Sequence, residues 1–256
     1  MEAREATYGR AVGGDDAITT RLGAAALPIG VVLTAIFEVF FHPQREDPMD
    51  NPAVFMEYAN SESWTAVHLG QYFGFLLILG GLIALYYSIS AQPGMGSGVA
   101  PFGLAAAVTT AASYTVLQAV DGITLKRAVD VWASAPPDQQ TAAFAAAEAV
   151  RWTEIGMNSL SNFLTGLTLL LLGLAIALGR GVYPRWTGWM AAVSGVAFMY
   201  NGVVEVAYEG FGPSIVKLVG LLLLAVWAFI MAVLMLRNAR PVSIPAGRVR
   251  RSSNPS

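Results

Sequence analysis

The sequence contains no cysteine, and this absence excludes disulfide bonds, iron–sulfur clusters, thiolate zinc sites and cysteine nucleophiles. Charged residues are also scarce: they make up 12% of the 256 residues, whereas hydrophobic residues make up 55%. Soluble domains carry roughly 25% charged residues, so this chain lacks the polar side chains needed to cover a water-facing surface. An apolar solvent is therefore expected, and lipid is the usual one.

The net charge is only −2, which is too small to indicate a nucleic-acid partner. The glycine-rich segment at residues 94–98 lacks both the preceding strand and the lysine of a nucleotide-binding loop. The acidic stretch at residues 46–57 does not have the spacing of an EF-hand loop. No motif in the sequence therefore names a reaction.

Six apolar stretches reach the length of about 20 residues that a membrane-spanning helix needs. They cover residues 22–41, 69–90, 99–121, 155–179, 187–207 and 213–236. The sequence therefore predicts an all-α integral membrane protein, with a six-helix transmembrane domain over residues 22–237. A polar N-terminal tail covers residues 1–21, and a basic C-terminal tail covers residues 238–256.

Basic residues are distributed unevenly between the two ends of these spans. With six crossings, both termini lie on one side, and that side carries ten of the 15 Lys and Arg residues. The other side carries five, namely Arg45, Lys126, Arg127, Arg151 and Lys217. Because the side richer in Lys and Arg is cytoplasmic, both termini are expected in the cytoplasm. The abundance of Ala and Gly is typical of a GC-rich bacterial genome, so we expect the bacterial inner (plasma) membrane.

The two long loops, at about residues 42–68 and 122–154, are then extracytoplasmic. In the first loop, the motif Asp50-Asn51-Pro52 predicts the start of a short helix over about residues 52–60. We expect this helix to lie on the membrane surface. The side chains expected to face the membrane are Phe55, Met56 and Tyr58, with Trp64 as an interfacial anchor.

In the second loop, the third span runs on past Asp121 to about Ala133. The motif Pro136-Pro137-Asp138 then breaks the helix, and an Ala-rich run with strong helix propensity leads into the fourth span. The sequence therefore predicts a helical hairpin whose arms continue two membrane spans. Residues 122–150 of this hairpin are a candidate surface for a protein partner.

Polar side chains gather at one end of the predicted spans. Spans one, three and five carry them near their C-terminal ends, and spans two, four and six near their N-terminal ends. With alternating crossings, all of them fall in the outer half of the membrane, which indicates a polar pocket there. The residues are Thr34, Glu38 and His42; His68, Gln71 and Tyr72; Tyr114, Gln118 and Asp121; Arg151, Glu154, Asn158, Asn162 and Thr165; Asn201, Glu205 and Tyr208; Ser214 and Lys217.

Three carboxylates of this set, Glu38, Asp121 and Glu154, are the candidate catalytic residues, because shielded carboxyl groups act as acids near neutral pH. The spacing of Arg151 and Glu154 predicts an ion pair along one helix. The candidate ligand-binding residues are His42, His68, Gln71, Tyr114, Gln118, Arg151, Asn158, Asn201 and Glu205.

Simpler interpretations exist for part of the set. Polar side chains near helix ends reach toward the lipid headgroups, and small polar ones hold helices together. The first interpretation is favoured for Lys217, Arg127, Glu209 and Tyr208. The second is favoured for Thr34, Asn162 and Thr165.

His42 and His68 are the only histidines of the chain, and the predicted topology places both at the same membrane boundary. With a neighbouring carboxylate they could hold a divalent metal ion. Otherwise they serve as hydrogen-bonding groups or helix caps. A haem is disfavoured, because bis-histidine ligands lie deeper in a membrane and these segments lack a glycine-rich face for the porphyrin.

The stretch from His42-Pro43 to His68-Leu69-Gly70-Gln71, together with Gln118-Ala119-Val120-Asp121-Gly122 and Glu154, resembles a recurring type of small bacterial six-helix membrane protein. The resemblance covers about residues 22–237. It implies that the outer polar cluster is the part these proteins share, and it implies no particular activity or cofactor.

Three functional classes remain open. The first is a protein that binds or transports a small polar or lipid-like ligand in the outer pocket. The second is a membrane-embedded enzyme, using acid–base or metal chemistry on a lipid-like substrate. The third is an accessory or sensory subunit, whose polar cluster is structural and whose hairpin contacts a partner.

Overall fold

The computed structural model describes residues 2–43, 45–91, 94–179, 181 and 183–239, with side chains from residue 17 onward. Within these ranges, helices are the only regular secondary structure. They are α1 (Glu2–Ile36), η1 (Phe37–Phe41), α2 (Asn51–Ala59), α3 (Trp64–Ser90), α4 (Met95–Ala119), η2 (Val120–Leu125), α5 (Lys126–Ser134), α6 (Gln140–Leu178), α7 (Arg185–Tyr200), η3 (Asn201–Val206), α8 (Ala207–Glu209) and α9 (Ile215–Asn238).

Six helical segments of the described chain are long and apolar enough to cross a membrane, as in a multi-pass membrane protein. Each exceeds the length of about 20 residues that a bilayer requires. They coincide with the six predicted spans, several of them extended at one end. The segments are Ala17–Phe41, Trp64–Ser90, Met95–Ser134, Gln140–Leu178, Arg185–Glu209 and Ile215–Asn238.

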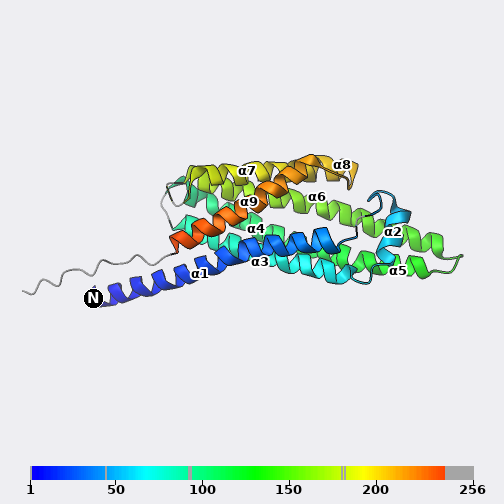
Figure 1. Ribbon diagram of the computed structural model, residues 1–256, viewed down its shortest axis with the longest axis horizontal. Helices are drawn as coiled ribbons and strands as arrows, with labels where there is room; N and C mark the ends of the chain where they lie inside the picture. Colours follow the sequence, from blue (N-terminus) through cyan, green and yellow to red (C-terminus); the bar gives the residue numbers. More distant parts are fainter. Residues whose placement is uncertain (1, 44, 92–93, 180, 182, 240–256) are drawn as a thin grey trace, which may run out of the picture.

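The long helices form a closed ring. Each one packs against the next along the chain, in the order α1, α3, α4, α6, α7 and α9, and α9 packs against α1. Figure 1 shows α9 running obliquely, with its N-terminal end beside α8 and its C-terminal end near α1. There the Arg21 guanidinium donates to the carbonyl oxygen of Ala239 at 3.2 Å. We call this the termini end, and the opposite end, which carries α2 and α5, the hairpin end.

The polar N-terminal segment is helical, because α1 begins at Glu2 and continues into the first span without a break. No proline precedes Pro28, so nothing before it removes a backbone N–H from the helix. Most of the C-terminal tail predicted over residues 238–256 lies outside the described residues.

The hairpin has the predicted form. Helix α4 continues through η2 into α5, and α6 is a single helix of 39 residues that begins before the fourth span. The short helix α2 also starts as predicted: the Asp50 carboxylate accepts a hydrogen bond from the Ala53 amide at 3.4 Å, and Pro52 lies in the first turn.

The expected orientation of α2 is wrong. Phe55 and Tyr58 are buried, as is Trp64 at the start of α3, and they pack with Leu125 and Val129 of the hairpin. The apolar inner face of the hairpin must be covered, and α2 covers it. Of the side chains expected to face the membrane, only Met56 is exposed, at 47%.

The odd-numbered spans all contain a π-helical turn toward the hairpin end, namely η1, η2 and η3. In η1, for example, the His42 amide donates to the carbonyl oxygen five residues earlier, on Phe37. A π-turn adds one residue to a helical turn and redirects the side chains that follow, and such turns are frequent at functional sites. Each of the three contains one acidic residue: Glu38, Asp121 and Glu205.

Glycines let the paired helices approach closely. A Cβ atom added to Gly195 of α7 would lie 2.5 Å from the carbonyl oxygen of Gly166 on α6. One added to Gly188 would lie 2.5 Å from the carbonyl oxygen of Gly173. Backbone atoms cannot move aside as a flexible side chain can, so this interface requires residues without a Cβ atom.

We expect Gly195→Ala to reduce stability by about 1–3 kcal/mol, the usual cost of overpacking. The matched control is Gly156→Ala on α6, where an added Cβ meets nothing within 4 Å; it should be neutral or stabilising, because alanine favours helix more than glycine does. Unfolding of the purified variants in detergent measures both effects. Equal effects at the two sites would contradict the proposed role of Gly195.

Candidate functional site

A cavity of about 640 Å³ lies within the ring, and all six long helices contribute to its lining. Its ionisable and amide side chains lie toward the hairpin end, whereas the deeper part is apolar apart from hydroxyl groups such as those of Thr110 and Thr168, which hydrogen-bond to each other. On α3, the lining runs from Trp64 to Leu82, which spans about 27 Å at 1.5 Å per residue. The deep apolar lining includes Ile78, Leu79, Leu82, Leu169, Phe198, Leu221 and Leu224.

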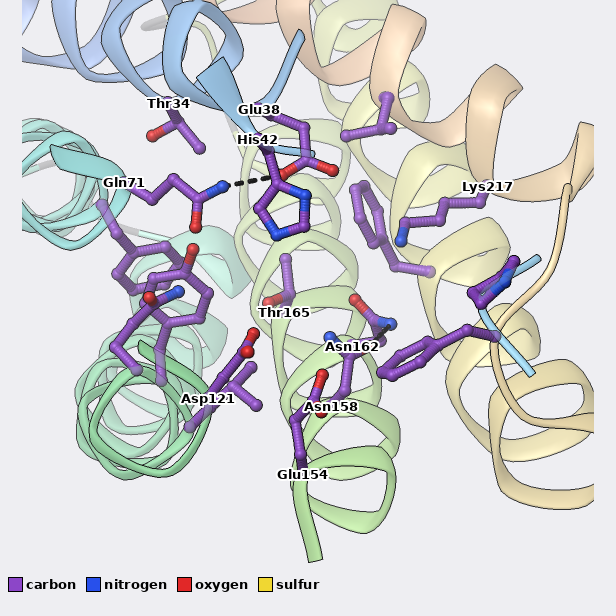
Figure 2. A pocket seen from close by; sticks show the side chains of 18 of the residues that line it. Thr34, Glu38, His42, Gln71, Asp121, Glu154, Asn158, Asn162, Thr165 and Lys217 are labelled. Atoms are coloured by element: carbon purple, nitrogen blue, oxygen red, sulfur yellow. Dashed lines mark hydrogen bonds between the residues drawn. The ribbon is translucent and has the colours of Figure 1, made fainter. Parts of the chain in front are cut away.

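One wall of the polar part is made by η1 and α3. The Gln71 amide donates to the Glu38 carboxylate at 2.7 Å, as Figure 2 shows. His42 follows η1 and also lines the cavity; its ring centroid lies 5.2 Å from that of His68. Burial lowers the pKa of His42, although the nearby Glu38 carboxylate opposes this shift. A lowered pKa favours the neutral imidazole, which can both donate and accept a hydrogen bond.

His68 holds Asp121 in place. Its Nδ1 atom lies 2.8 Å from the carbonyl oxygen of Trp64, so Nδ1 is the donor, because a carbonyl only accepts. Its Nε2 atom lies 3.0 Å from a carboxylate oxygen of Asp121. Asp121 lines the cavity, whereas His68 is buried behind it and does not.

The two predicted metal-ligand histidines are thus neighbours. Among the described residues, however, no group of three or more His, Asp or Glu side chains is placed to hold a metal ion. One ring nitrogen of His68 is also committed to a backbone carbonyl. The metal site at His42 and His68 therefore stays a prediction.

The predicted ion pair of Arg151 with Glu154 is confirmed, with 2.7 Å between the guanidinium and the carboxylate. Both side chains are buried. The guanidinium also donates to the carbonyl oxygen of Pro48 at 2.8 Å, and it lies 4.7 Å from the ring centroid of Phe211. Arg151 therefore ties α6 to the linker after η1 and to the segment before α9.

A chain of hydrogen bonds leads from the cavity to α9. Asn162 donates to Asn158 at 2.8 Å and to Asn201 at 3.1 Å. Asn201 donates to Glu205 at 2.6 Å, and the Ser214 hydroxyl donates to the same carboxylate. This confirms that Asn162 holds helices together, although it also lines the cavity.

The structure brings most of the predicted site residues to this cavity. Three of them, His68, Asn201 and Glu205, do not line the cavity. His68 contacts Asp121 and Asn201 contacts Asn162, both of which line it, and Glu205 contacts Asn201. The predicted catalytic and ligand-binding roles stay predictions. The predicted site residues that line the cavity are Glu38, His42, Gln71, Tyr114, Gln118, Asp121, Arg151, Glu154 and Asn158.

The interpretation of Lys217 as an outward-reaching side chain is wrong. Lys217 lines the cavity, and Figure 2 shows its side chain directed inward from α9. The signal for this lay in the sequence, because Leu221 and Leu224 follow at helical spacing on the same face and also line the cavity. Tyr208, by contrast, is 85% exposed, as expected of an interfacial side chain.

Comparison with protein-family models, with curated proteins and with solved structures finds no match for this chain. Its function must therefore be argued from the cavity. The cavity joins a polar end, containing acids, bases and amides, to an apolar end within one space.

We expect Arg151→Leu to destabilise the protein by about 3–5 kcal/mol, because it leaves the buried Glu154 carboxylate without its counter-charge. The double variant Arg151→Leu/Glu154→Leu should recover most of this loss, since it removes both charges. Denaturant unfolding in detergent compares the two. A double variant as unstable as the single one would show that the pair itself is not what matters.

Proposed function

We propose that the protein binds an amphiphilic, lipid-like molecule in this cavity, with the head group at the hairpin end and the apolar part toward the middle of the bundle. The observation that carries the proposal is the division of one continuous lining into a polar end and an apolar end. Ligand sites with such a division orient an amphiphile in one direction.

The size of the cavity supports this function. Its volume of about 640 Å³ lies within the range of roughly 300–1,000 Å³ that is typical of small-molecule sites. The apolar end is lined by aliphatic and aromatic side chains from α3, α6, α7 and α9. Water in such a place gains few hydrogen bonds, whereas an acyl chain replaces it favourably.

The arrangement of α1 and α9 supports access from the lipid. The two helices meet near Arg21 and Ala239, and α9 leads away from α1 toward the hairpin end (Figure 1). There Glu38 on η1 and Lys217 on α9 both line the cavity. Beside them, Phe40 is 75% exposed, as suits contact with acyl chains. From the bias of basic residues, we expect this end of the cavity to lie in the outer half of the membrane.

Filling the apolar end tests the proposal. We expect Leu79→Trp to lower the amount of co-purified or added amphiphile by about tenfold, since the indole occupies the space of the acyl chain. Native mass spectrometry of the purified protein measures the bound molecules. The matched control is Leu222→Trp on the outer surface of α9, where the side chain is 58% exposed.

Leu224→Phe narrows the same end of the cavity from another helix. It provides a second test if Leu79→Trp does not fold. The proposal fails if the folded cavity variants hold as much amphiphile as the Leu222→Trp control.

A second function, acid–base catalysis on the bound molecule, is favoured by one observation: Glu38, Asp121 and Glu154 line the same polar end as His42. Acid–base catalysis needs such groups within reach of the head group. Wild-type protein incubated with a defined amphiphile would then change its mass, and Glu38→Gln would bind it without conversion. Unchanged amphiphile in the wild type contradicts this function and leaves the binding function in place.

The accessory-subunit alternative rests on the hairpin. Its apolar inner face is covered by α2 of the same chain, so this face offers no surface for a partner. The polar cluster, moreover, surrounds a cavity instead of filling the space between the helices. Both observations favour a ligand over a purely structural role.

A further inference from the structure

The polar end of the cavity has two walls of opposite character, and they predict the chemistry of the head group. We propose that the bound amphiphile has a zwitterionic head group, with a primary ammonium against Asp121 and Gln118 and a phosphate or carboxylate against Lys217. The inference rests on the proposed function, because it concerns the head group of the molecule that the cavity binds.

The first wall, at the junction of α4 and η2, presents hydrogen-bond acceptors. Oδ1 of Asp121 and Oε1 of Gln118 are buried, and among the described residues neither has a hydrogen-bond partner. Gln118 is only 8% exposed, and both residues line the cavity. Buried acceptors are nearly always satisfied in a folded protein. A ligand with several N–H donors would satisfy both oxygens.

The second wall, at the start of α9, presents a cation. Within the described part of the chain, no carboxylate lies within 4.0 Å of the Lys217 ammonium, since the ion pairs found there involve His68, Lys126 and Arg151. Lys217 also lies in the first turn of a helix of 24 residues, which Ser214 caps. The positive end of the helix dipole adds to its attraction for an anion.

The lining of the cavity as a whole is acidic, and Lys217 is an isolated cation in it. Two of the carboxylates face a base: Glu154 is paired with Arg151 at 2.7 Å, and Asp121 lies 3.0 Å from His68. Three more line the cavity, namely Glu46 and two that accept hydrogen bonds from amide groups, Glu38 and Glu57. Figure 2 shows Asp121 and Lys217 on opposite sides, with the neutral side chains of α6 between them. A purely anionic head group would have to approach the carboxylates, and a purely cationic one the lysine. A zwitterion places each charge opposite its complement.

Three single-chain phospholipids with the same acyl chain separate these possibilities. Lysophosphatidylethanolamine has an ammonium with N–H donors, lysophosphatidylcholine has a cation without them, and lysophosphatidylglycerol is an anion. Native mass spectrometry of the full-length protein in detergent measures the binding of each. We expect the ethanolamine lipid to bind about tenfold more tightly than the other two, the usual effect of charge-assisted hydrogen bonds.

Variants assign this preference to the two walls. Lys217→Met should weaken binding of the ethanolamine lipid about tenfold, and Lys217→Arg should retain it, because either cation attracts the phosphate. Gln118→Met should weaken binding of the ethanolamine lipid and leave binding of the choline lipid unchanged. Arg127→Met, which removes an exposed charge on the hairpin, is the control and should change nothing.

The outcomes distinguish the inference from the function on which it rests. Equal binding of the three lipids, or tighter binding of the glycerol lipid, overturns the zwitterionic head group but keeps the cavity as a lipid site. A Lys217→Met variant that binds the ethanolamine lipid as tightly as the wild type does also overturns the zwitterionic head group. If the wild type binds none of the three, the proposed function itself fails.

Discussion

A buried cation must find its counter-charge inside the protein, and this constraint organises the hairpin end of the bundle. Arg151 lies where α6 passes from the ring into the hairpin, and it is buried. Its guanidinium contacts Glu154, the carbonyl oxygen of Pro48 and the ring of Phe211. Because leaving this buried charge unpaired would strongly destabilise the protein, the segments that contact Arg151 are held in one arrangement around it.

Much of the fold could be predicted, because the decisive signals are local. The length of the apolar runs gives the spans, and Pro136 and Pro137 give the turn of the hairpin. The pair of Arg151 and Glu154 follows from i, i+3 spacing on one helix. The orientation of α2 could not be predicted in this way, since Phe55 is as apolar as a lipid-facing residue. Only the neighbouring hairpin determines what covers it.

The site was predictable in location but less so in detail. Alternating spans bring the polar ends together whatever the order of the helices around the ring. The partner of Asp121, in contrast, depends on that order: α3 lies beside α4 and supplies His68. The direction of Lys217 depends on the oblique course of α9 (Figure 1). The residues adjacent to Asp121 do not encode its partner, whereas Leu221 and Leu224 at helical spacing do mark the face of α9 on which Lys217 lies.

The π-turns place the acidic residues of the odd-numbered spans at the hairpin end of the bundle. In a regular α-helix, the face that packs against a neighbour is fixed by the residues of the previous turn. An extra residue in one turn frees the part of the helix that follows from that register. In η3 the close contact with α6 continues, because a Cβ atom added to Gly202 would lie 2.5 Å from the carbonyl oxygen of Ser159. Glu205 of the same turn accepts hydrogen bonds from Asn201 at 2.6 Å and from Ser214. The π-turn η3 therefore carries both the last glycine of the interface with α6 and the carboxylate that is bonded to the segment before α9, so one short stretch of helix serves packing and polar contacts together.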